Sequence, residues 1–511
     1  MSKLRQTLKQ ILSDVVLFAH HASGLKLREY QIGPAVAIIE RIRAGKGGSI
    51  VVLFPRQSGK NEVQAQIEAY LLVLLSPQDA ELVKVSPTWK PQSLNAMRRL
   101  NRVLARNLVA RGLWKKEEGY IYRFGKARLY FLSGQPEASV VGATANVLLQ
   151  CDEAQDVSTS KWDKDFAPMA ASTNAIRVFW GTAWTSRTLL ARELRAAKKE
   201  EKKDGIKRVF TMTAEDVAAE VPAYGEFVAE QVQKLGRQHP LVKTQYFSEF
   251  IDAEGGMFPP ARMAMMKGSH DRQLEPAEGD IYAFLIDVAG EDESASDEIQ
   301  DLERDKLRNP ARDATALTIV KMDLSTLEDE LIKAPTYEVM DRRLWVGVPH
   351  TRLYGEIKAL NNVWNPRYIV VDATGVGAGL SSFLDKSIPG RVLPFMFTAK
   401  SKSNLGWTFL AVCDTGRFKD YKVREGYFDK VTAQFWTELE NVQYEATENR
   451  MVKWSVPDGT RDPATGDLVH DDLVISAAMC GELDSQEWSV GGAALVIQGK
   501  DPLEDMDDYG Y

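Results

Sequence analysis

The sequence predicts an α/β protein of two domains, and three features of the chain predict it. An apolar run at 49–54 ends in a loop with a Gly-Lys pair, and a helical pattern follows at 62–75. Apolar, β-branched runs then alternate with helical patterns to about residue 250, as in a mostly parallel sheet. After a change in composition at 251–275, a second series of such runs begins at 281, and several of them end in an aspartate.

Composition limits the class of protein. A chain of 511 residues is longer than one hydrophobic core usually serves, and 44% hydrophobic with 26% charged residues is typical of a globular protein. No stretch approaches the roughly 18 apolar residues of a membrane span. Cys151, Cys413 and Cys480 lack metal-ligand spacing, which indicates buried thiols in a reducing, cytosolic setting. A net charge of −7 argues against a globally basic nucleic-acid binder but allows a local basic strip or acidic metal sites.

Residues 1–48 have a helical pattern, and we assign them to the first domain. The pattern begins with apolar residues at helical spacing, namely Leu4, Leu8, Ile11, Leu12, Val15 and Val16. A further helix is predicted at 27–42 and ends at the loop signal Gly45-Lys46-Gly47-Gly48.

The segment 49–62 has the layout of a phosphate-binding P-loop. Backbone N–H groups of such a loop point at the helix N-terminus, where the dipole favours an anion, and Lys60 can reach the outer phosphates. Two positions depart from the usual motif. Phe54 replaces the first glycine, and Asn61 replaces the Ser or Thr that normally ligates Mg²⁺. The segment therefore indicates a nucleotide site, with metal ligation at Asn61 left open.

A P-loop needs an acid that holds Mg²⁺ and a base that orients the attacking water. The run 147–151 predicts a strand that ends at Asp152 and Glu153. Asp152 would hold the metal and Glu153 would polarise the water. The alternative is a strand that ends in two acids at a turn, and the polar Gln150 inside the apolar run is atypical of a buried strand.

Two further residues are weaker candidates for the nucleotide site. Thr182 follows the predicted strand 175–180, where its hydroxyl could sense the γ-phosphate; the alternative is an ordinary turn. Gln31 precedes the P-loop, where its amide could bond both the donor and the acceptor edge of adenine.

Two helical patterns are rich in basic residues. The helix predicted at 92–111 carries Arg98, Arg99, Arg102 and Arg106, and a charged helix at 187–208 interleaves Lys and Arg with Glu. Either could offer a local basic strip to a nucleic acid, while a solvated helix face is the simpler interpretation of the second.

The second half places carboxylates at the ends of apolar elements. Asp287 and Asp372 end predicted strands, and Asp471 or Asp472 begins an apolar helix. Each alone is typical of a structural role, but three in one sheet can converge, and converging carboxylates imply divalent metal. Two Mg²⁺ or Mn²⁺ ions would suit hydrolysis of a phosphodiester. The charged segment 291–312 predicts a mobile loop or a short exposed helix.

Taken together, these motifs resemble the large terminase subunits, the DNA-packaging motors of tailed bacteriophages. The resemblance covers about 27–478 and rests on the order and spacing of several motifs: Tyr30-Gln31, Arg56 to Lys60, Val147 to Glu153, Gly181-Thr182, Asp287, Asp372 and 470–473. It implies a RecA/ASCE-type P-loop ATPase domain at 49–250, a linker at 251–275, an RNase H-like nuclease domain at 276–485 and a flexible acidic tail at 486–511.

The resemblance also assigns roles to residues. In the nuclease site, Asp287, Asp372 and Asp471 would be catalytic and, with Asp472, would bind two Mg²⁺ or Mn²⁺ ions; Asp471 is favoured over Asp472. In the ATPase site Glu153 would be catalytic, and ATP with its Mg²⁺ would be held by Gln31, Arg56, Gln57, Ser58, Gly59, Lys60, Asn61, Asp152 and Thr182.

The partners and location implied by the resemblance are those of a packaging motor. The chain would form a ring, of five copies, on the portal protein of a procapsid, and would move double-stranded DNA inward. A small terminase subunit would choose the site at which the concatemer is cut. The protein would lie in the host cytoplasm, dock transiently on the procapsid, stay absent from the mature virion and make no contact with a membrane.

Two other functions fit parts of the sequence. Asp152-Glu153-Ala154-Gln155 is also typical of a superfamily 2 helicase or translocase, which needs a second RecA-like domain with arginine-rich motifs. Phe54 and Asn61 are compatible with a nucleotide-gated, DNA-binding scaffold that does not hydrolyse ATP.

Overall fold

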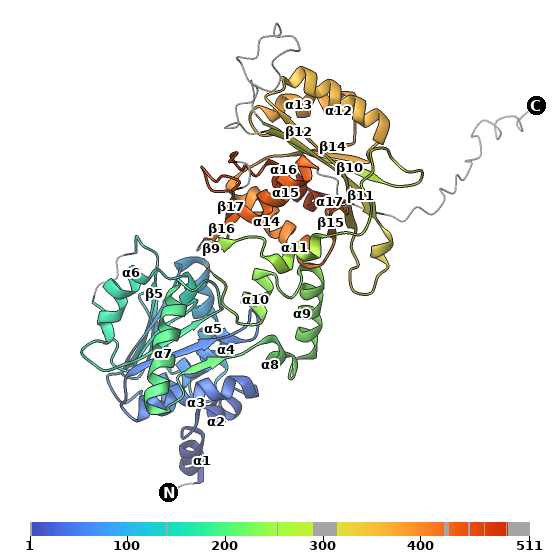
Figure 1. Ribbon diagram of the computed structural model, residues 1–511. Coiled ribbons are helices and arrows are strands. Elements are labelled where there is room, and N and C mark those ends of the chain that lie inside the picture. Colours follow the sequence, from blue (N-terminus) through green and yellow to red (C-terminus); the bar gives the residue numbers. More distant parts are fainter. Residues whose placement is uncertain are drawn as a thin grey trace, which may run out of the picture. The chain divides into compact units, whose positions relative to one another are not determined.

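The computed structural model describes residues 3–138, 142–252, 254–289, 314–423, 429–447, 450–463, 466–486 and 488 (Figure 1). The chain divides into two compact units. Unit 1 comprises Met1–Met265, Phe397–Thr415 and Gln434–Asp471, and unit 2 comprises Met266–Met396, Gly416–Ala433 and Asp472–Tyr511. The segment 291–312 and nearly all of the predicted tail at 486–511 lie outside the described residues.

The main sheet of unit 1 has the strand order β3-β4-β5-β2-β6-β7-β1-β8. Neighbours from β5 to β8 are parallel, whereas β3, β4 and β5 are antiparallel. β7 lies between β1, which leads into the Gly-Lys loop, and β6, which ends at the acidic pair, so the order is the predicted ASCE type. The strands are β1 (Gly48–Leu53), β2 (Glu81–Ser86), β3 (Trp114–Glu117), β4 (Ile121–Phe124), β5 (Ala127–Ser133), β6 (Leu148–Cys151), β7 (Ile176–Gly181) and β8 (Val209–Thr211).

Helices cover both faces of this sheet because its strands are apolar on both sides. Ile50 and Val52 of β1 belong to the core that includes α4, and Val51 and Leu53 belong to the core beneath α7. The helices of unit 1 are α1 (Lys3–Ile11), α2 (Val15–His21), α3 (Glu29–Arg43), α4 (Lys60–Leu74), α5 (Leu94–Arg106), α6 (Thr159–Lys161), α7 (Leu189–Asp204), α8 (Ala214–Ala218), α9 (Pro222–Leu235), α10 (Pro240–Tyr246), α11 (Pro260–Met266), α14 (Ala399–Asp414) and most of α15 (Lys430–Asn441).

The run Phe247-Ser248-Glu249-Phe250-Ile251 predicts a last strand of the first domain, and this prediction is wrong. Phe247 ends α10, and Ser248 adopts a left-handed φ of 55°, which interrupts an extended backbone. Only Ile251 pairs, in an isolated bridge with Thr185. The apolar residues of this segment pack against neighbouring side chains and do not form the hydrogen-bond ladder of a β-strand.

The domain boundary also differs from the predicted one. The prediction gives 276–485 to one domain, whereas 397–415 and 434–471 cluster with unit 1. Part of the reason is a small antiparallel sheet that joins distant segments, β9 (Glu254–Gly256), β16 (Gln443–Ala446) and β17 (Val452–Ser455).

His239 ties α14 to the α9–α10 connection. Its ring is buried, Nδ1 accepts the N–H of Leu241 (3.2 Å), and Nε2 donates to the carbonyl of Trp407 (3.0 Å). Burial lowers the pKa of His239 to about 4, although its bond to Trp407 acts in the opposite direction.

This low pKa predicts a pH-dependent stability. The unfolded chain takes up the proton near pH 6.5 and the folded chain only near pH 4, so the free energy of unfolding falls as the pH drops through this window, by about 3 kcal/mol from this group. Chemical denaturation of wild type and His239→Gln at several pH values tests it. We expect the wild-type-minus-variant difference to shrink from pH 7 to pH 4, and a difference independent of pH would contradict the assignment.

The sheet of unit 2 has the order β14-β13-β10-β11-β12-β15. β10, β11 and β12 form an antiparallel meander, while β13 pairs parallel with β10 and β14 parallel with β13. This is the RNase H-like order, so the predicted fold class is confirmed. The strands are β10 (Tyr282–Asp287), β11 (Ala314–Asp323), β12 (Thr336–Val346), β13 (Tyr368–Asp372), β14 (Val392–Phe395) and β15 (Phe418–Lys419).

Each face of this sheet carries its own helices (Figure 1). α12 (His350–Trp364) and α13 (Gly377–Ser387) cover the face that holds Phe284 and Ile286. On the opposite face lies α16 (Asp472–Ala478), whose Ser476 hydroxyl donates to the carbonyl of Leu285 (2.8 Å); α17 (Cys480–Leu483) follows. Alternation along β10 therefore turns Asp287 toward the α16 face.

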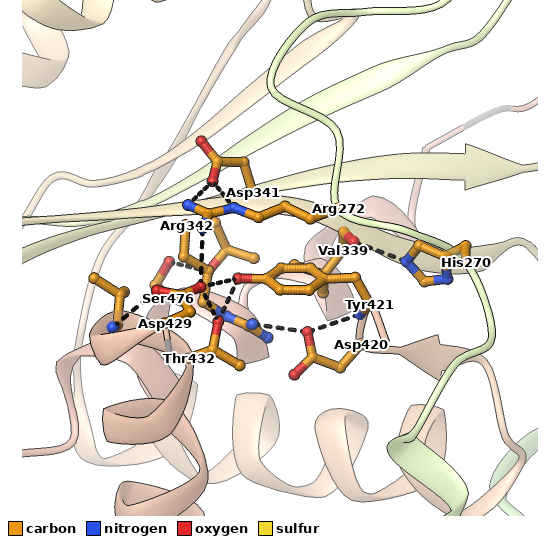
Figure 2. A network of polar contacts seen from close by, with 12 residues as sticks. His270, Arg272, Val339, Asp341, Arg342, Asp420, Tyr421, Asp429, Thr432 and Ser476 are labelled. Carbon is orange, nitrogen blue, oxygen red and sulfur yellow. Dashed lines mark hydrogen bonds and ion pairs between the residues drawn. The ribbon is translucent and has the colours of Figure 1, made fainter. Parts of the chain in front are cut away.

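A buried network of charges links β12 to the segment after β15 (Figure 2). Arg342 donates to Asp420 (2.7 Å), and neither side chain is more than 1% exposed. Arg272 bridges Asp341 (2.5 Å) and Asp429 (3.0 Å).

Asp420→Ala is expected to destabilise unit 2 by about 3–5 kcal/mol, because it removes the carboxylate that neutralises a buried guanidinium. Arg352→Ala, which breaks an exposed ion pair on α12, is the control and should cost under about 1 kcal/mol. Urea unfolding measures both. Equal losses for the two variants would show that burial of the Arg342 pair contributes nothing.

The cysteines and the lengths of the apolar helices were also considered in the sequence. All three cysteines are buried and free of disulfides, as predicted. Within the described ranges, no helix is long and apolar enough to cross a membrane.

Candidate functional sites

The loop between β1 and α4 has the backbone that a Gly-Lys motif requires. Gly59 precedes α4 at φ 91°, and a Cβ there would lie 2.7 Å from the side-chain amide nitrogen of Gln31. Gln57 is also left-handed, at φ 65°. Ser58 closes the turn, since its hydroxyl donates to the carbonyl of Pro55 (2.6 Å). Glycine at position 59 is thus demanded by both conformation and space.

Lys60 lies between the two predicted acids. Its Nζ is 3.0 Å from Asp152 Oδ1 and 2.5 Å from Glu153 Oε1, and the lysine is buried. Burial opposes the charge, but the attraction of the two carboxylates outweighs it and raises the pKa of Lys60. In this arrangement the lysine neutralises the acids, and an anion entering the loop would compete for it.

A buried network supports Asp152 from behind. Gln64 donates to Asp152 Oδ1 (3.1 Å) and accepts from Lys84 (2.6 Å), and Lys84 pairs with Glu68 (2.8 Å). Burial alone would raise the pKa of Asp152, but Lys60 and Lys84 hold it below its usual value. Gln150 donates to Glu68 (2.6 Å), which explains the polar residue inside strand β6.

A pocket of about 460 Å³ opens over the loop. Ser58, Asp152 and Gln31 do not line it; they are buried. The amide of Gln31 bonds the backbone of Arg28 (3.1 Å) and Gly59 (3.4 Å), so both its ends are engaged within the chain. The lining brings together seven predicted residues, namely Arg56, Gln57, Gly59, Lys60, Asn61, Glu153 and Thr182.

The pocket also contains residues that the sequence analysis did not assign to the site. Arg28, at the start of α3, donates to the hydroxyl of Tyr30 (2.7 Å), and Arg99 pairs with Glu62 (2.7 Å). The basic pattern of α5 predicted that Arg99 lies on a basic helix but not that its side chain lines this pocket. Nothing in the sequence around Arg28 predicted a place in the pocket. With Arg56 and Lys60, these residues make the pocket cationic, which suits a polyphosphate.

The donor set also fits a divalent cation beside the phosphates. Asp152 supplies a carboxylate, and Asn61 Oδ1 is a buried oxygen with no hydrogen-bond partner in the described part of the chain. An amide oxygen is a ligand that Mg²⁺ accepts. The departure from Ser or Thr at position 61 therefore still leaves an oxygen at that place.

In unit 2, the ends of two adjacent strands carry carboxylates. Ile286 of β10 is in register with Val371 of the parallel strand β13, so Asp287 and Asp372 follow side by side. Burial raises the pKa of Asp372, although its bonds to Thr374 act in the opposite direction. A nearby cation would favour the charged form.

The structure separates the two candidates that begin α16. Asp472 is buried and accepts the N–H of Ala314 (2.8 Å), two positions from Ala316, the partner of Asp287 in the ladder. Asp471, the residue before it, lies 3.7 Å from the Nζ of Lys402. Over the described residues, no group of three or more His, Cys, Asp or Glu side chains could hold a metal ion. The bond to Ala314 thus places Asp472 near the part of β11 that pairs with Asp287, and which of the two acids is a metal ligand stays a prediction.

Comparison with known proteins gives matches among solved structures. No protein-family model and no curated protein matches the chain. The large terminase of bacteriophage HK97 is similar in structure, with 12% identity and a TM-score of 0.41, over 92% of this chain and 99% of that one. A large terminase from a thermophilic bacteriophage, in complex with ADP, has 11% identity and a TM-score of 0.43 over 88% and 98%. The magnesium-bound large terminase nuclease of another thermophilic phage has 16% identity and a TM-score of 0.31 over 44% and 96%.

Proposed function

We propose that the chain is the large subunit of a phage terminase, which hydrolyses ATP to move double-stranded DNA into a procapsid and cuts that DNA with a metal-dependent nuclease. One observation carries the proposal. Lys60, Asp152 and Glu153 meet at the base of a cationic pocket on an ASCE-type sheet, and a second, RNase H-like sheet ends in paired aspartates.

In the ATPase site, each residue has one task. Lys60, together with Arg28, Arg56 and Arg99 at the pocket wall, binds the phosphates, and Glu153 accepts the proton of the attacking water. Asp152 and Asn61 would hold Mg²⁺, which supplies charge neutralisation on the phosphates when bound. Phosphate binding takes Lys60 away from Glu153 and so frees that carboxylate to act as a base.

In the nuclease site, Asp287 and Asp372 at the ends of β10 and β13 would hold Mg²⁺ or Mn²⁺, two ions by the resemblance, and Asp472 would have to move toward them to complete the site, because the described side chains do not form a group of three carboxylates. Such ions lower the pKa of a bound water and stabilise the leaving oxygen of a phosphodiester. The side chains of the chain itself fix the strand ends, since the Asp372 carboxylate accepts the N–H of Thr374 (2.7 Å). We replace Asp471 by Asp472 in the proposed site because of the bond to Ala314.

Double-stranded DNA is the proposed cargo. Arg98, Arg102 and Arg106 are exposed and recur every four residues on α5, which places them on one helix face about 6 Å apart along the axis. Such a stripe can contact successive phosphates. The portal protein, the small terminase subunit, a pentameric ring and transient docking in the host cytoplasm complete the proposal.

The sheet order of unit 2 favours this function over a superfamily 2 helicase, which would need a second RecA-like domain. The test is a packaging assay with the full chain, procapsids of the same phage and ATP, scored as DNA protected from DNase. We expect protection with the wild type and none with Lys60→Ala. Unwinding of duplex DNA without protection would support the helicase, and DNA binding without hydrolysis would support the scaffold.

A further inference from the structure

Gln155 is a buried amide that contacts three parts of the ATPase site. It lies in a short 3₁₀ turn after β6 and is 2% exposed. Its Nε2 donates to Glu153 Oε2 (2.7 Å) and to Asp156 Oδ2 (3.0 Å), and its Oε1 accepts the backbone N–H of Thr182 (3.1 Å). No role was assigned to it from the sequence beyond its place in the acidic box.

The surrounding backbone is built closely around this amide. A Cβ on Gly181 would clash with Gln155 Oε1 and also with Leu190 Cδ2, so a larger residue at the end of β7 would have to displace both side chains. Glu153 is left-handed, at φ 47°, a conformation that costs energy for a residue other than glycine and persists where neighbours hold it. Lys60 holds one carboxylate oxygen of Glu153, and Gln155 holds the other.

We propose that Gln155 is the positioning residue that fixes the catalytic Glu153 against the turn at 181–182. Because one amide bonds both, the carboxylate that activates water and the turn after β7 keep a constant relation. When the phosphates engage Lys60, Gln155 is the contact that still orients Glu153. The inference rests on the proposed ATP hydrolysis and adds to it a link between the base and this turn.

Asp156 extends the link into the later part of unit 1. It shares the Nε2 of Gln155 and lies 3.7 Å from Arg450, in the segment 434–471. Burial raises the pKa of Asp156 to about 6, against the pull of Arg450. The amide thus bonds two acids, Glu153 and Asp156, which pair in turn with Lys60 and Arg450.

Two substitutions separate orientation from mere packing. Gln155→Leu removes donor and acceptor, and we expect kcat for ATP hydrolysis to fall about 10- to 100-fold while KM changes less than about 3-fold. Gln155→Glu keeps the acceptor for Thr182 but loses the donor to Glu153 at pH 8. Its kcat relative to wild type should recover toward pH 6, where the new carboxyl, once protonated, can donate again.

The experiment measures kcat and KM of the full-length wild type and variants from pH 6 to pH 8.5. Gln78→Glu, an exposed site, is the matched control and should equal the wild type at every pH. Gly181→Ala, whose Cβ would crowd both the Gln155 amide and Leu190, should also lower kcat, and the pH dependence of Gln155→Glu decides the matter if Gln155→Leu folds poorly. Wild-type kcat in Gln155→Leu, or an unchanged Gln155→Glu defect from pH 8 to pH 6, would overturn the inference alone. A wild type without turnover would overturn the proposed function on which it rests.

Discussion

Lys60→Ala is expected to abolish ATP hydrolysis, with a loss in kcat of about 10²-fold or more, because the lysine is the cation at the base of the proposed phosphate pocket. Asp152 keeps Lys84 and Gln64 nearby, so the fold should survive the change. A phosphate-release assay in the presence of Mg²⁺ and double-stranded DNA measures the loss. Lys115→Ala, at an exposed lysine, is the control and should keep full activity.

A second variant at the same site isolates the base. Glu153→Gln preserves shape and a hydrogen-bonding group but cannot accept the proton, so kcat should fall about 10²- to 10⁴-fold while nucleotide still binds. Glu153→Ala should lose turnover as well. DNA cleavage by these variants should stay at the wild-type level, since the nuclease carboxylates lie in unit 2. Loss of cleavage together with hydrolysis would show that the two activities are not separable.

Asp372→Asn is expected to abolish DNA cleavage, by at least about 10²-fold, because it removes the charge that would hold the metal at the end of β13. Conversion of supercoiled plasmid to linear DNA with Mn²⁺ measures this, and ATP hydrolysis should stay intact. Asp385→Asn, exposed on α13, is the control. Unchanged cutting by Asp372→Asn would remove Asp372 from the site.

The same assay decides between the two acids at the start of α16. Asp472 is buried and bonded to the first residue of β11, whereas Asp471 lies near Lys402. We therefore expect Asp472→Asn to lose cleavage as Asp372→Asn does, and Asp471→Asn to keep most of it. The reverse result would restore Asp471, the residue that the sequence favoured.

Local chain patterns predicted the parts of the fold that depend on them. β1, β6 and β10 coincide with the apolar runs at 49–54, at 147–151 and from 281, because a strand buried on both faces needs apolar side chains on both. The acidic pair and the strand-end aspartates were predicted in the same way, because charged residues mark the positions at which these buried strands end. The pattern failed at 247–251, where Phe247 and Ile251 pack without forming a ladder, since apolar content alone does not fix φ.

Contacts between distant segments could not be predicted. The polar Gln150 is atypical of a buried strand, and its partner Glu68 lies on α4, far away in the sequence. Gln155 likewise bonds the backbone of Thr182, which the local sequence does not indicate. Nothing in the local sequence of Arg28 indicates that its side chain lines the pocket over the Gly-Lys loop. The assignment of 397–415 and 434–471 to unit 1 could not be predicted either, because it depends on tertiary packing.

The most direct test of the account is steady-state ATP hydrolysis by the full chain with Mg²⁺, measured with and without linear double-stranded DNA. We expect turnover that rises when DNA is added and that is lost in both Lys60→Ala and Glu153→Gln. Wild-type hydrolysis no faster than that of these two variants, with or without DNA, would contradict it.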